Sequence, residues 1–475
     1  MSKLEEVCER VLALITPSEE ERERVMGLAR EVMNRLRAVL REEGVDGEVR
    51  LEGSLAKDTW LSGEADVDIF VRFKPDVSRD FFRKRFLELA REATKGFKHV
   101  ERFAEHPYLE CLAGDVRVNI VPCYAVEPGG WLSATDRTPY HTQYVLSRLD
   151  ERLRAAIRLL KKFMKGIGAY GAEIKVGGFS GYLCELLAIY YGGFREVLEG
   201  ALRWRKGVLI DPADHYRGRE GEAREFFRHH LIVVDPVDPA RNAAASVRLD
   251  KMCIFMAAAK AFLERPSEGF FFPRGPEEKG IDELRREIEG RGTSILAIHV
   301  KPGRVVPDVL WGQAFRTLRA LRGLLKNEGF RVLRSTAWSD EREHLVLLLE
   351  LEASELPPVV RHLGPPVWAG EHVERFLSKQ LANPGLVSGP YVEGDRWVAL
   401  VRRRWRRASD LIEAKLGDDG GRSVGVAPLL AEKIKEHFEV LEGTRILALC
   451  RELREFKRFL VEFLRGRPSW LAPEA

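Results

Sequence analysis

The segment DVDIFVRF, residues 66–73, constrains the fold of this chain more than any other stretch. Its apolar and polar residues alternate, and a period of two predicts a β-strand with one buried face. Val67 and Ile69 belong to the apolar face. Asp66 and Asp68 share the opposite face, about 7 Å apart, where two carboxylates can clasp divalent cations between them. The chain must therefore build a sheet whose polar face carries this acidic pair.

A second strand-like segment, VRVNIVPCY at residues 116–124, shows the same alternation. Val118 and Ile120 point to one face, and Arg117 and Asn119 point to the other. A strand with one apolar and one polar face often lines a site. Here the polar face offers the amide of Asn119, where the rest of the chain leads us to expect a carboxylate.

Gly53 and Ser54 precede the acidic strand, after a predicted strand at residues 47–52 and before a short predicted helix. A glycine in such a turn lets backbone N–H groups approach a phosphate, and the serine hydroxyl adds a donor. Asp-x-Asp alone is common on solvated strand faces, and Gly-Ser alone is only a turn. Together, and in this order, they indicate a site that holds a metal-bound triphosphate.

The chain has 475 residues, too many for one hydrophobic core, so two to four domains are expected. It is 45% hydrophobic and 32% charged with a net charge of +4, which is typical of a soluble protein, so affinity for nucleic acid must come from local clusters. Its six cysteines are scattered without a CxxC motif, which predicts neither a zinc site nor a disulfide framework. There is no signal-like segment, and the longest apolar run, at residues 252–259, is too short to span a membrane. We therefore expect a cytoplasmic protein that does not bind membranes.

An α+β multidomain fold is expected, with domains at residues 1–145, 146–275 and 276–475. The first is an α/β head with predicted helices at 4–43 and 79–94 and predicted strands at 47–52, 66–73 and 115–123. Within it, Ser18 and Glu21 have the spacing of a capping box that starts a second helix.

The middle domain is predicted to be mostly helical. Its helices lie at residues 148–167, 177–194 and 243–264, and a loop at 233–242 precedes the last of them. The first helix has an apolar stripe and, beside it, a basic stripe made of Arg154, Arg158, Lys161 and Lys165. Ser180 is expected to cap the second helix. From residue 276 onward helices alternate with strands, which indicates one or two α+β modules.

Gly-Ser followed by Asp-x-Asp resembles the nucleotidyltransferase superfamily of DNA polymerase β. Longer segments resemble the class I, archaeal-type CCA-adding enzymes more specifically. These segments are GSLAKDTWLSG (53–63), AEHPY (104–108), IVPCY (120–124), DRTPYHTQY (136–144), YGAEIKVGGFSGYLCELL (170–187) and VDPVDPARNAAA (234–245). The resemblance implies a polymerase β-like head, and an enzyme that adds C, C and A to the tRNA 3′ end from CTP and ATP without a template. It also implies two Mg²⁺ ions and the release of pyrophosphate.

Carried over to this sequence, the resemblance implies the following roles: Asp66 and Asp68 as metal ligands; Gly53, Ser54 and Lys57 at the triphosphate; His141, Lys161 and Tyr170 in the nucleotide pocket; and Arg241 at the incoming base. Read alone, each residue type has a plainer explanation. Lys161 would be a solvated lysine, Tyr170 a core aromatic and His141 a surface histidine. Arg241 would be in an ion pair with Asp235 or Asp238.

The family pattern has an aspartate where this chain has Asn119, and that aspartate completes the metal site. Asp115 is on the same strand face but about 13 Å away, too far to replace it. The amide can bind a metal through its oxygen, but it brings no charge. The substitution is deliberate, or natural in an enzyme with weakened chemistry, or the mark of a non-catalytic tRNA-binding protein. We expect the chain to bind CTP, ATP and tRNA, and to incorporate nucleotides orders of magnitude more slowly than its Asn119→Asp form.

Two basic segments are candidates for RNA contact. RWVALVRRRWRR, residues 396–407, interleaves tryptophans with arginines, which suits phosphate contact and stacking, although an ordinary basic strand edge has the same pattern. The helix at 148–165 offers a second basic strip. The resemblance implies binding of the acceptor stem and T arm of tRNA, and a homodimer. A poly(A) polymerase or oligoadenylate synthetase relative is the alternative enzyme.

Overall fold

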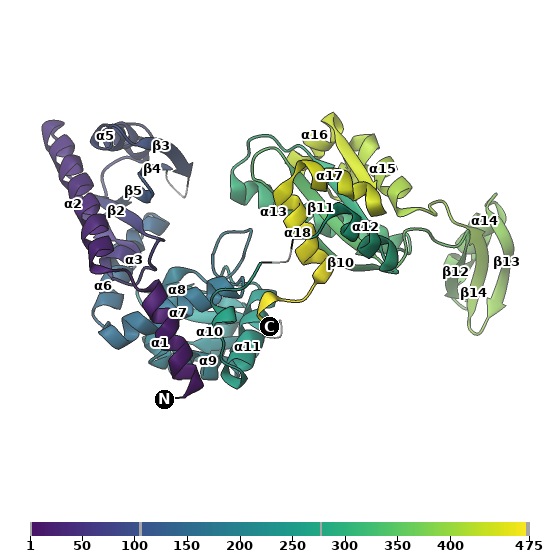
Figure 1. The fold of residues 1–475 in the computed structure, drawn as a ribbon. Helices are drawn as coiled ribbons and strands as arrows, with labels where there is room; N and C mark the ends of the chain where they lie inside the picture. Colours follow the sequence, from purple (N-terminus) through teal and green to yellow (C-terminus); the bar gives the residue numbers. More distant parts are fainter. Residues whose placement is uncertain (1, 104–106, 276–277, 472–475) are drawn as a thin grey trace. The chain divides into compact units, whose positions relative to one another are not determined.

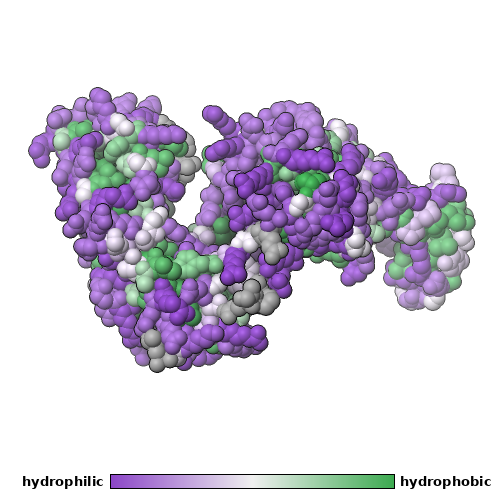
Figure 2. Space-filling model, viewed as in Figure 1, coloured by the Kyte–Doolittle hydropathy of each residue, from purple (hydrophilic) through white to green (hydrophobic). Residues whose placement is uncertain are grey.

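The computed structural model describes residues 2–103, 107–275 and 278–471. The chain forms two compact units, one made of Met1–Gly275 with Pro468–Ala475 and the other of Pro276–Arg467 (Figure 1). The first unit contains both the predicted head and the predicted middle domain, and the boundary near residue 145 stays a prediction. The surface in view is mainly hydrophilic (Figure 2), as a chain with 32% charged residues requires.

A five-stranded sheet of order β1-β2-β5-β4-β3 organises the first part of the chain. β2 and β5 run parallel, and the other neighbours are antiparallel. The strands are β1 (Glu48–Glu52), β2 (Asp66–Phe73), β3 (Lys98–Phe103), β4 (Pro107–Ala113) and β5 (Val116–Tyr124). Most apolar residues of this sheet pack into one core with helices α2 (Glu19–Glu42) and α5 (Arg85–Ala93), whereas Phe70, Val121 and Cys123 form a separate small cluster.

The predicted strands of the head are confirmed to within a residue at each end. The predicted helix at 79–94 is two helices, α4 (Arg79–Arg83) and α5, which meet at Lys84. Strands β3 and β4 were not predicted. Residues 104–106 of the AEHPY segment lie outside the described residues.

The predicted capping box is half correct. Ser18 caps α2 by accepting a 3.1 Å hydrogen bond from the Glu21 backbone N–H. The Glu21 carboxylate does not return to the cap. Instead it accepts hydrogen bonds from Ser62 Oγ at 2.7 Å and from the Gly63 backbone N–H at 2.8 Å. The first turn of α2 therefore holds the loop that leads into the acidic strand.

The remainder of the first unit is built on a second, aromatic-rich core. Its helices are α1 (Lys3–Ile15), α6 (Thr138–Leu146), α7 (Glu151–Gly166), α8 (Gly181–Tyr191), α9 (Phe194–Ala201), α10 (Glu220–Phe227) and α11 (Leu249–Glu264). Ser180 caps α8 as predicted, by accepting from the Leu183 N–H at 3.1 Å. The predicted loop at 233–242 is wrong, because β7 (Leu231–Asp235) and β8 (Asp238–Asn242) form a hairpin beside β6 (Val208–Ile210). The helix predicted from residue 243 begins at Leu249.

The second unit contains two antiparallel sheets, in line with the predicted α+β modules. The larger has the order β10-β11-β9-β15 and a helical layer on each face. The smaller has the order β12-β14-β13 and contacts α14 (Gly370–Leu381). The strands are β9 (Ser294–Val300), β10 (Val332–Ser339), β11 (Leu345–Leu351), β12 (Val359–Pro366), β13 (Leu386–Glu393), β14 (Arg396–Arg402) and β15 (Phe438–Glu442). The other helices are α12 (Ile281–Gly290), α13 (Pro307–Asn327), α15 (Ala408–Asp419), α16 (Pro428–Glu436), α17 (Leu447–Glu452) and α18 (Arg454–Arg465). Within the part of the chain described, no helix combines the length and apolar character needed to cross a bilayer.

Candidate active site

Asp66 and Asp68 of β2 and Arg117 and Asn119 of β5 form one surface of the sheet, called the acidic face below. It lies where the two strands run side by side. In the register of these strands Asp66 is paired with Arg117, and Asp68 is paired with Asn119. Asn119 Nδ2 donates a 2.9 Å hydrogen bond to Asp68 Oδ1, so the amide faces the acidic pair directly. The prediction that these side chains share one polar face is confirmed.

Burial dominates the electrostatics of this face. It raises the pKa of Asp68 to about 6, although the hydrogen bond from Asn119 acts in the opposite direction. Burial also raises the pKa of Asp66, against the Arg117 guanidinium, whose Nε lies 3.7 Å from Asp66 Oδ1. Protein cations do not fully compensate these carboxylates, and a bound cation would offset the cost of burying their charge.

Gly53 shapes the turn in front of Asp68. It begins the short helix α3 (Gly53–Ala56) directly after β1, with a φ of +71° that favours glycine. A Cβ built on Gly53 would lie 2.1 Å from Asp68 Oδ2, closer than atoms can approach. The glycine therefore allows the turn to pass directly beside the Asp68 carboxylate.

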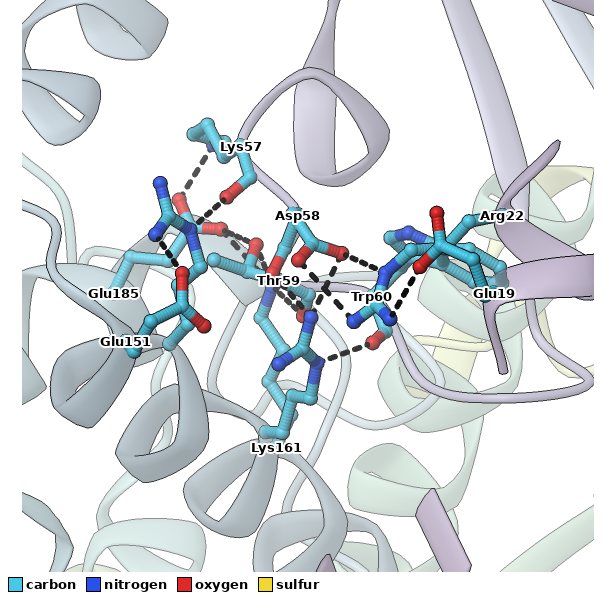
Figure 3. Close-up of polar contacts among 11 residues, drawn as sticks. Glu19, Arg22, Lys57, Asp58, Thr59, Trp60, Glu151, Lys161 and Glu185 are labelled. Carbon is cyan, nitrogen blue, oxygen red and sulfur yellow. Dashed lines mark hydrogen bonds and ion pairs between the residues drawn. The ribbon is translucent and has the colours of Figure 1, made fainter. Parts of the chain in front are cut away.

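Glu185 of α8 is a buried carboxylate that joins two of the predicted site residues, Lys57 of the triphosphate contacts and Lys161 of the nucleotide pocket (Figure 3). Its oxygens lie 2.5 Å from Lys57 Nζ and 3.0 Å from Lys161 Nζ, and Thr59 Oγ1 donates to it at 2.7 Å. Burial alone would raise the pKa of Glu185, but Lys161, Lys57 and these hydrogen bonds lower it to about 2. Burial lowers the pKa of Lys161. One carboxylate thus holds both ammonium groups in place.

The basic stripe of α7 fixes the segment that carries Lys57. Arg154, Arg158 and Lys161 donate hydrogen bonds of 2.6–3.3 Å to backbone carbonyls of residues 57–60. The fourth member, Lys165, forms an ion pair with a glutamate of the next loop. The expectation that this stripe offers a second basic strip to RNA is therefore wrong, because its cations are used to hold the head segment against α7.

A second buried carboxylate, Asp235 at the end of β7, gathers the other predicted pocket residues. It lies 2.8 Å from His141 Nε2 and 2.5 Å from Arg241 Nη1, and Tyr182 donates to it at 3.1 Å. The His141 ring stacks on the Tyr182 ring with centroids 4.1 Å apart. Burial lowers the pKa of His141. Because Lys57 Nζ lies 6.0 Å from the Tyr182 centroid, the two networks meet at this tyrosine.

A cavity of about 440 Å³ opens beside the acidic face. Ser54, Asp66, Lys161 and Tyr170 line it, together with Arg117 from β5. The structure thus brings four of the predicted site residues to one space. Six predicted site residues do not line the cavity. Gly53, Asp68 and Asn119 lie beside it on the acidic face, and Lys57, His141 and Arg241 belong to the adjoining carboxylate networks.

Comparison with known proteins agrees with this geometry. Three family models match: a nucleotidyltransferase domain at residues 33–141, the second domain of tRNA nucleotidyltransferase at 155–272, and the C-terminal domain of the CCA-adding enzyme at 291–443. A CCA-adding enzyme of Methanopyrus kandleri is 40% identical over 98% of both chains. That of Archaeoglobus fulgidus is 37% identical over 94% of this chain and 96% of its own length.

This chain belongs to the CCA-adding enzyme family. The family assignment makes it a tRNA nucleotidyltransferase with the multidomain α+β fold expected from the sequence. Nucleotidyltransferases of this kind use divalent metal ions. The acidic face supplies two carboxylates, Asp66 and Asp68, that could bind such ions. Its donors are all oxygen atoms, which suit a hard divalent cation. Within the described residues no three acidic, histidine or cysteine side chains already converge on one point.

The Gly53 turn allows a sharp test of the acidic face. We expect Gly53→Ala to lower nucleotide addition by about 10²-fold or more, because the added methyl group displaces the Asp68 carboxylate by more than a site of this kind tolerates. Gly44→Ala is the matched control: Gly44 has a similar φ of +66° and open space around its Cβ position. Both variants are expected to lose about 1–2 kcal/mol of stability through backbone strain. Equal activity of the two variants in a steady-state assay would contradict this account of Gly53.

Sequence reasoning missed the carboxylates that organise the site. Glu185 lies in a segment that matches the family, and a single carboxylate inside the apolar run LCELLAIYY already signals a buried, paired charge. Asp235 appeared only as one of two partners for Arg241. In the structure Arg241 forms its ion pair with Asp235, whereas Asp238 pairs with Arg137 at 2.6 Å.

Proposed function

We propose that this chain adds C, C and A to the 3′ end of tRNA, using CTP and ATP and releasing pyrophosphate. The observation that carries the proposal is the pair of carboxylates on β2: Asp66 lines the cavity together with Ser54, and Asp68 lies beside it next to the Gly53 turn. The family relationship, which extends over nearly the whole chain, supports tRNA as the acceptor.

In the reaction, the tRNA 3′-hydroxyl attacks the α-phosphorus of the bound nucleotide. Asp66 and Asp68 would hold Mg²⁺, which when bound neutralises the triphosphate and stabilises the charge that develops on the oxygens. Asn119 orients Asp68 through its hydrogen bond and adds no charge of its own.

The nucleotide would lie along the cavity, with Ser54 and Lys161 at the triphosphate and Tyr170 against the base or ribose. Gly53 would leave the backbone N–H groups of the turn open to the phosphates. The lysines start from a defined position because Glu185 holds them. His141 and Arg241, both fixed by Asp235, would contact the nucleotide from the adjoining network.

The segment at residues 396–407 is the proposed contact for the acceptor stem and T arm. Part of it is committed to the fold, since Arg396 donates to the Gly364 carbonyl at 2.8 Å and Arg403 to the Glu328 carbonyl at 3.2 Å. Arg402 and Arg404 are exposed, and Arg404 lies 5.1 Å from the Trp405 ring centroid. We further propose that the enzyme acts in the cytoplasm and forms a homodimer.

The proposal is tested with a tRNA that lacks its CCA end. We expect incorporation of two C residues when CTP is supplied alone, and completion with A when ATP is added. Addition of A alone, or of long A tracts, would favour a poly(A) polymerase or oligoadenylate synthetase relative. Tight binding of the tRNA without any addition would favour a non-catalytic tRNA-binding protein.

A further inference from the structure

Arg117 of β5 is a half-exposed cation that lines the cavity of the proposed nucleotide site. Its Nε lies 3.7 Å from Asp66 Oδ1 and 3.9 Å from Glu110 Oε2, separations that allow attraction between charges but are too long for hydrogen bonds. Among the residues that the structure describes, no acceptor takes a hydrogen bond from this guanidinium. Its N–H donors are therefore available to a ligand, and 53% of the side chain is exposed.

The other charged side chains of this cavity are more tightly engaged than Arg117. Lys161 lies 3.0 Å from the buried carboxylate of α8, and Lys165 forms an ion pair with a glutamate of the neighbouring loop. Asp115 accepts hydrogen bonds of 2.8 and 3.2 Å from an arginine of α2. An anion that enters the cavity can therefore bind Arg117 without breaking an existing hydrogen bond.

Arg117 and the Gly53-Ser54 turn lie on opposite sides of β2. In the sheet β2 has β1 as its neighbour on one side and β5 on the other. The turn follows β1, and the triphosphate is placed there. In phosphoryl transfer the attacking and leaving oxygens are roughly in line, on opposite sides of the phosphorus. With the leaving pyrophosphate on the β1 side, the attacking RNA strand therefore approaches from the β5 side, where Arg117 lies.

Leu112 of β4 adds an apolar surface next to Arg117. The two residues are directly opposite each other in the register of β4 and β5, and both line the cavity. Side chains paired in this way lie on the same face of the sheet, with Cβ atoms about 4.5–5.5 Å apart. Leu112 is 39% exposed, which is unusual for a leucine on a strand of a packed sheet. A cation beside an exposed apolar side chain suits a nucleotide, which combines a charged phosphate with an apolar base.

We propose that Arg117 binds the last internucleotide phosphate of the RNA acceptor, with Leu112 against the terminal nucleoside. The idea rests on the proposed function. The long separations from Asp66 and Glu110 let the guanidinium turn to the RNA, and two of its N–H groups match two phosphate oxygens. Because every RNA strand carries this phosphate, Arg117 places the 3′-hydroxyl at the nucleotide without taking part in the choice of base.

The test gives each protein two acceptors: a tRNA that lacks CCA, and the same tRNA with an uncharged methylphosphonate as its last linkage. The starting chain is compared with Arg117→Gln and Arg117→Lys. Arg35→Gln is the matched control, because Arg35 is 45% exposed and pairs with Glu31 at 2.5 Å on α2. Fluorescence anisotropy without nucleotide measures tRNA affinity across a salt series. Single-turnover assays measure addition of C, and of A to a tRNA that ends in CC. Circular dichroism verifies that each variant is folded.

We expect Arg117→Gln to weaken binding of the unmodified tRNA by about tenfold, and to slow the addition of C and of A alike, because a charge-assisted contact is lost. The slope of log affinity against log salt should become shallower by about 0.7, the value for one phosphate of a single strand. The methylphosphonate should weaken binding to the starting chain by about tenfold, but to Arg117→Gln by less than about twofold. Arg117→Lys should lie between the two proteins, and Arg35→Gln should behave as the starting chain does.

Two results would overturn the role of Arg117. One is a methylphosphonate that weakens binding equally in the starting chain and in Arg117→Gln. The other is an Arg117→Gln variant that binds tRNA normally but has a raised KM for CTP, which would place the guanidinium at the triphosphate. Failure of the proposed function looks different, since no protein in the series would then add C or A. In that case the affinities measured without nucleotide still decide whether Arg117 binds the last phosphate.

Discussion

Replacing Asp68 by asparagine is expected to abolish nucleotide addition while the fold is kept. Asp68 is at the centre of the acidic face, between the Gly53 turn and Asn119. An asparagine has the same size but loses the charge that would bind the metal ion and, through it, the triphosphate. We expect a fall of about 10³-fold or more in the rate, equal to about 4 kcal/mol of transition-state stabilisation. Single-turnover incorporation of CTP at saturating Mg²⁺ measures it.

The control for this loss is Asp46→Asn. Asp46 forms an exposed ion pair with Lys74 at 2.8 Å, and exposed pairs contribute little to stability. The rate of nucleotide addition by Asp46→Asn should stay within about twofold of that of the starting chain. Binding of CTP to the Asp68→Asn variant, measured by equilibrium dialysis without metal, should be nearly unchanged. A variant that kept more than a tenth of the starting rate would show that Asp68 is not a ligand of the metal.

The acidic face was predictable from the sequence because its signal is local. A period of two places Asp66 and Asp68 on one side of β2, and Arg117 and Asn119 on one side of β5. Which strands then become neighbours is decided by the tertiary fold. Strand β4 was not predicted from the sequence, and neither was its pairing with β5.

The sequence misled where one pattern fits two structures. Pro236 and Pro239 in DPVDPARN favour a loop, but the segment folds as a hairpin, and Pro239 lies on β8, at the edge of its sheet where a proline costs no ladder hydrogen bond. The basic stripe of α7 looked like a solvated surface. Three of its four cations are instead bound to backbone carbonyls of residues 57–60, a contact between segments about 100 residues apart that no local pattern reports.

Glu185→Gln is expected to produce the largest loss of stability among single substitutions at the site. Glutamine keeps the shape of the side chain but leaves the buried ammonium groups of Lys57 and Lys161 without a counter-charge. Breaking a buried ion pair by removing one partner costs about 3–5 kcal/mol. Glu199→Gln is the matched control, because Glu199 forms a half-exposed pair with Arg195 on α9 and should cost less than about 0.5 kcal/mol. Hydrogen exchange of α7 and α8 peptides across a urea series measures the loss of stability in each of the two variants.

The loss of stability caused by Glu185→Gln should become smaller in acid. The pKa of Glu185 is lowered from its ordinary 4.5 to about 2, so its stabilisation is complete above about pH 4.5 and is lost as the pH falls towards 2. The difference in stability between the starting chain and Glu185→Gln should therefore be largest near pH 7 and much smaller near pH 3.

A double variant tests the coupling of these charges. Adding Lys161→Met to Glu185→Gln should recover part of the stability, because one uncompensated charge is removed. A difference that stays constant with pH, or a double variant that loses the sum of both single effects, would show that these charges are not coupled. Coupling of this kind makes Glu185 the group that holds Lys57 and Lys161 in position before the nucleotide arrives.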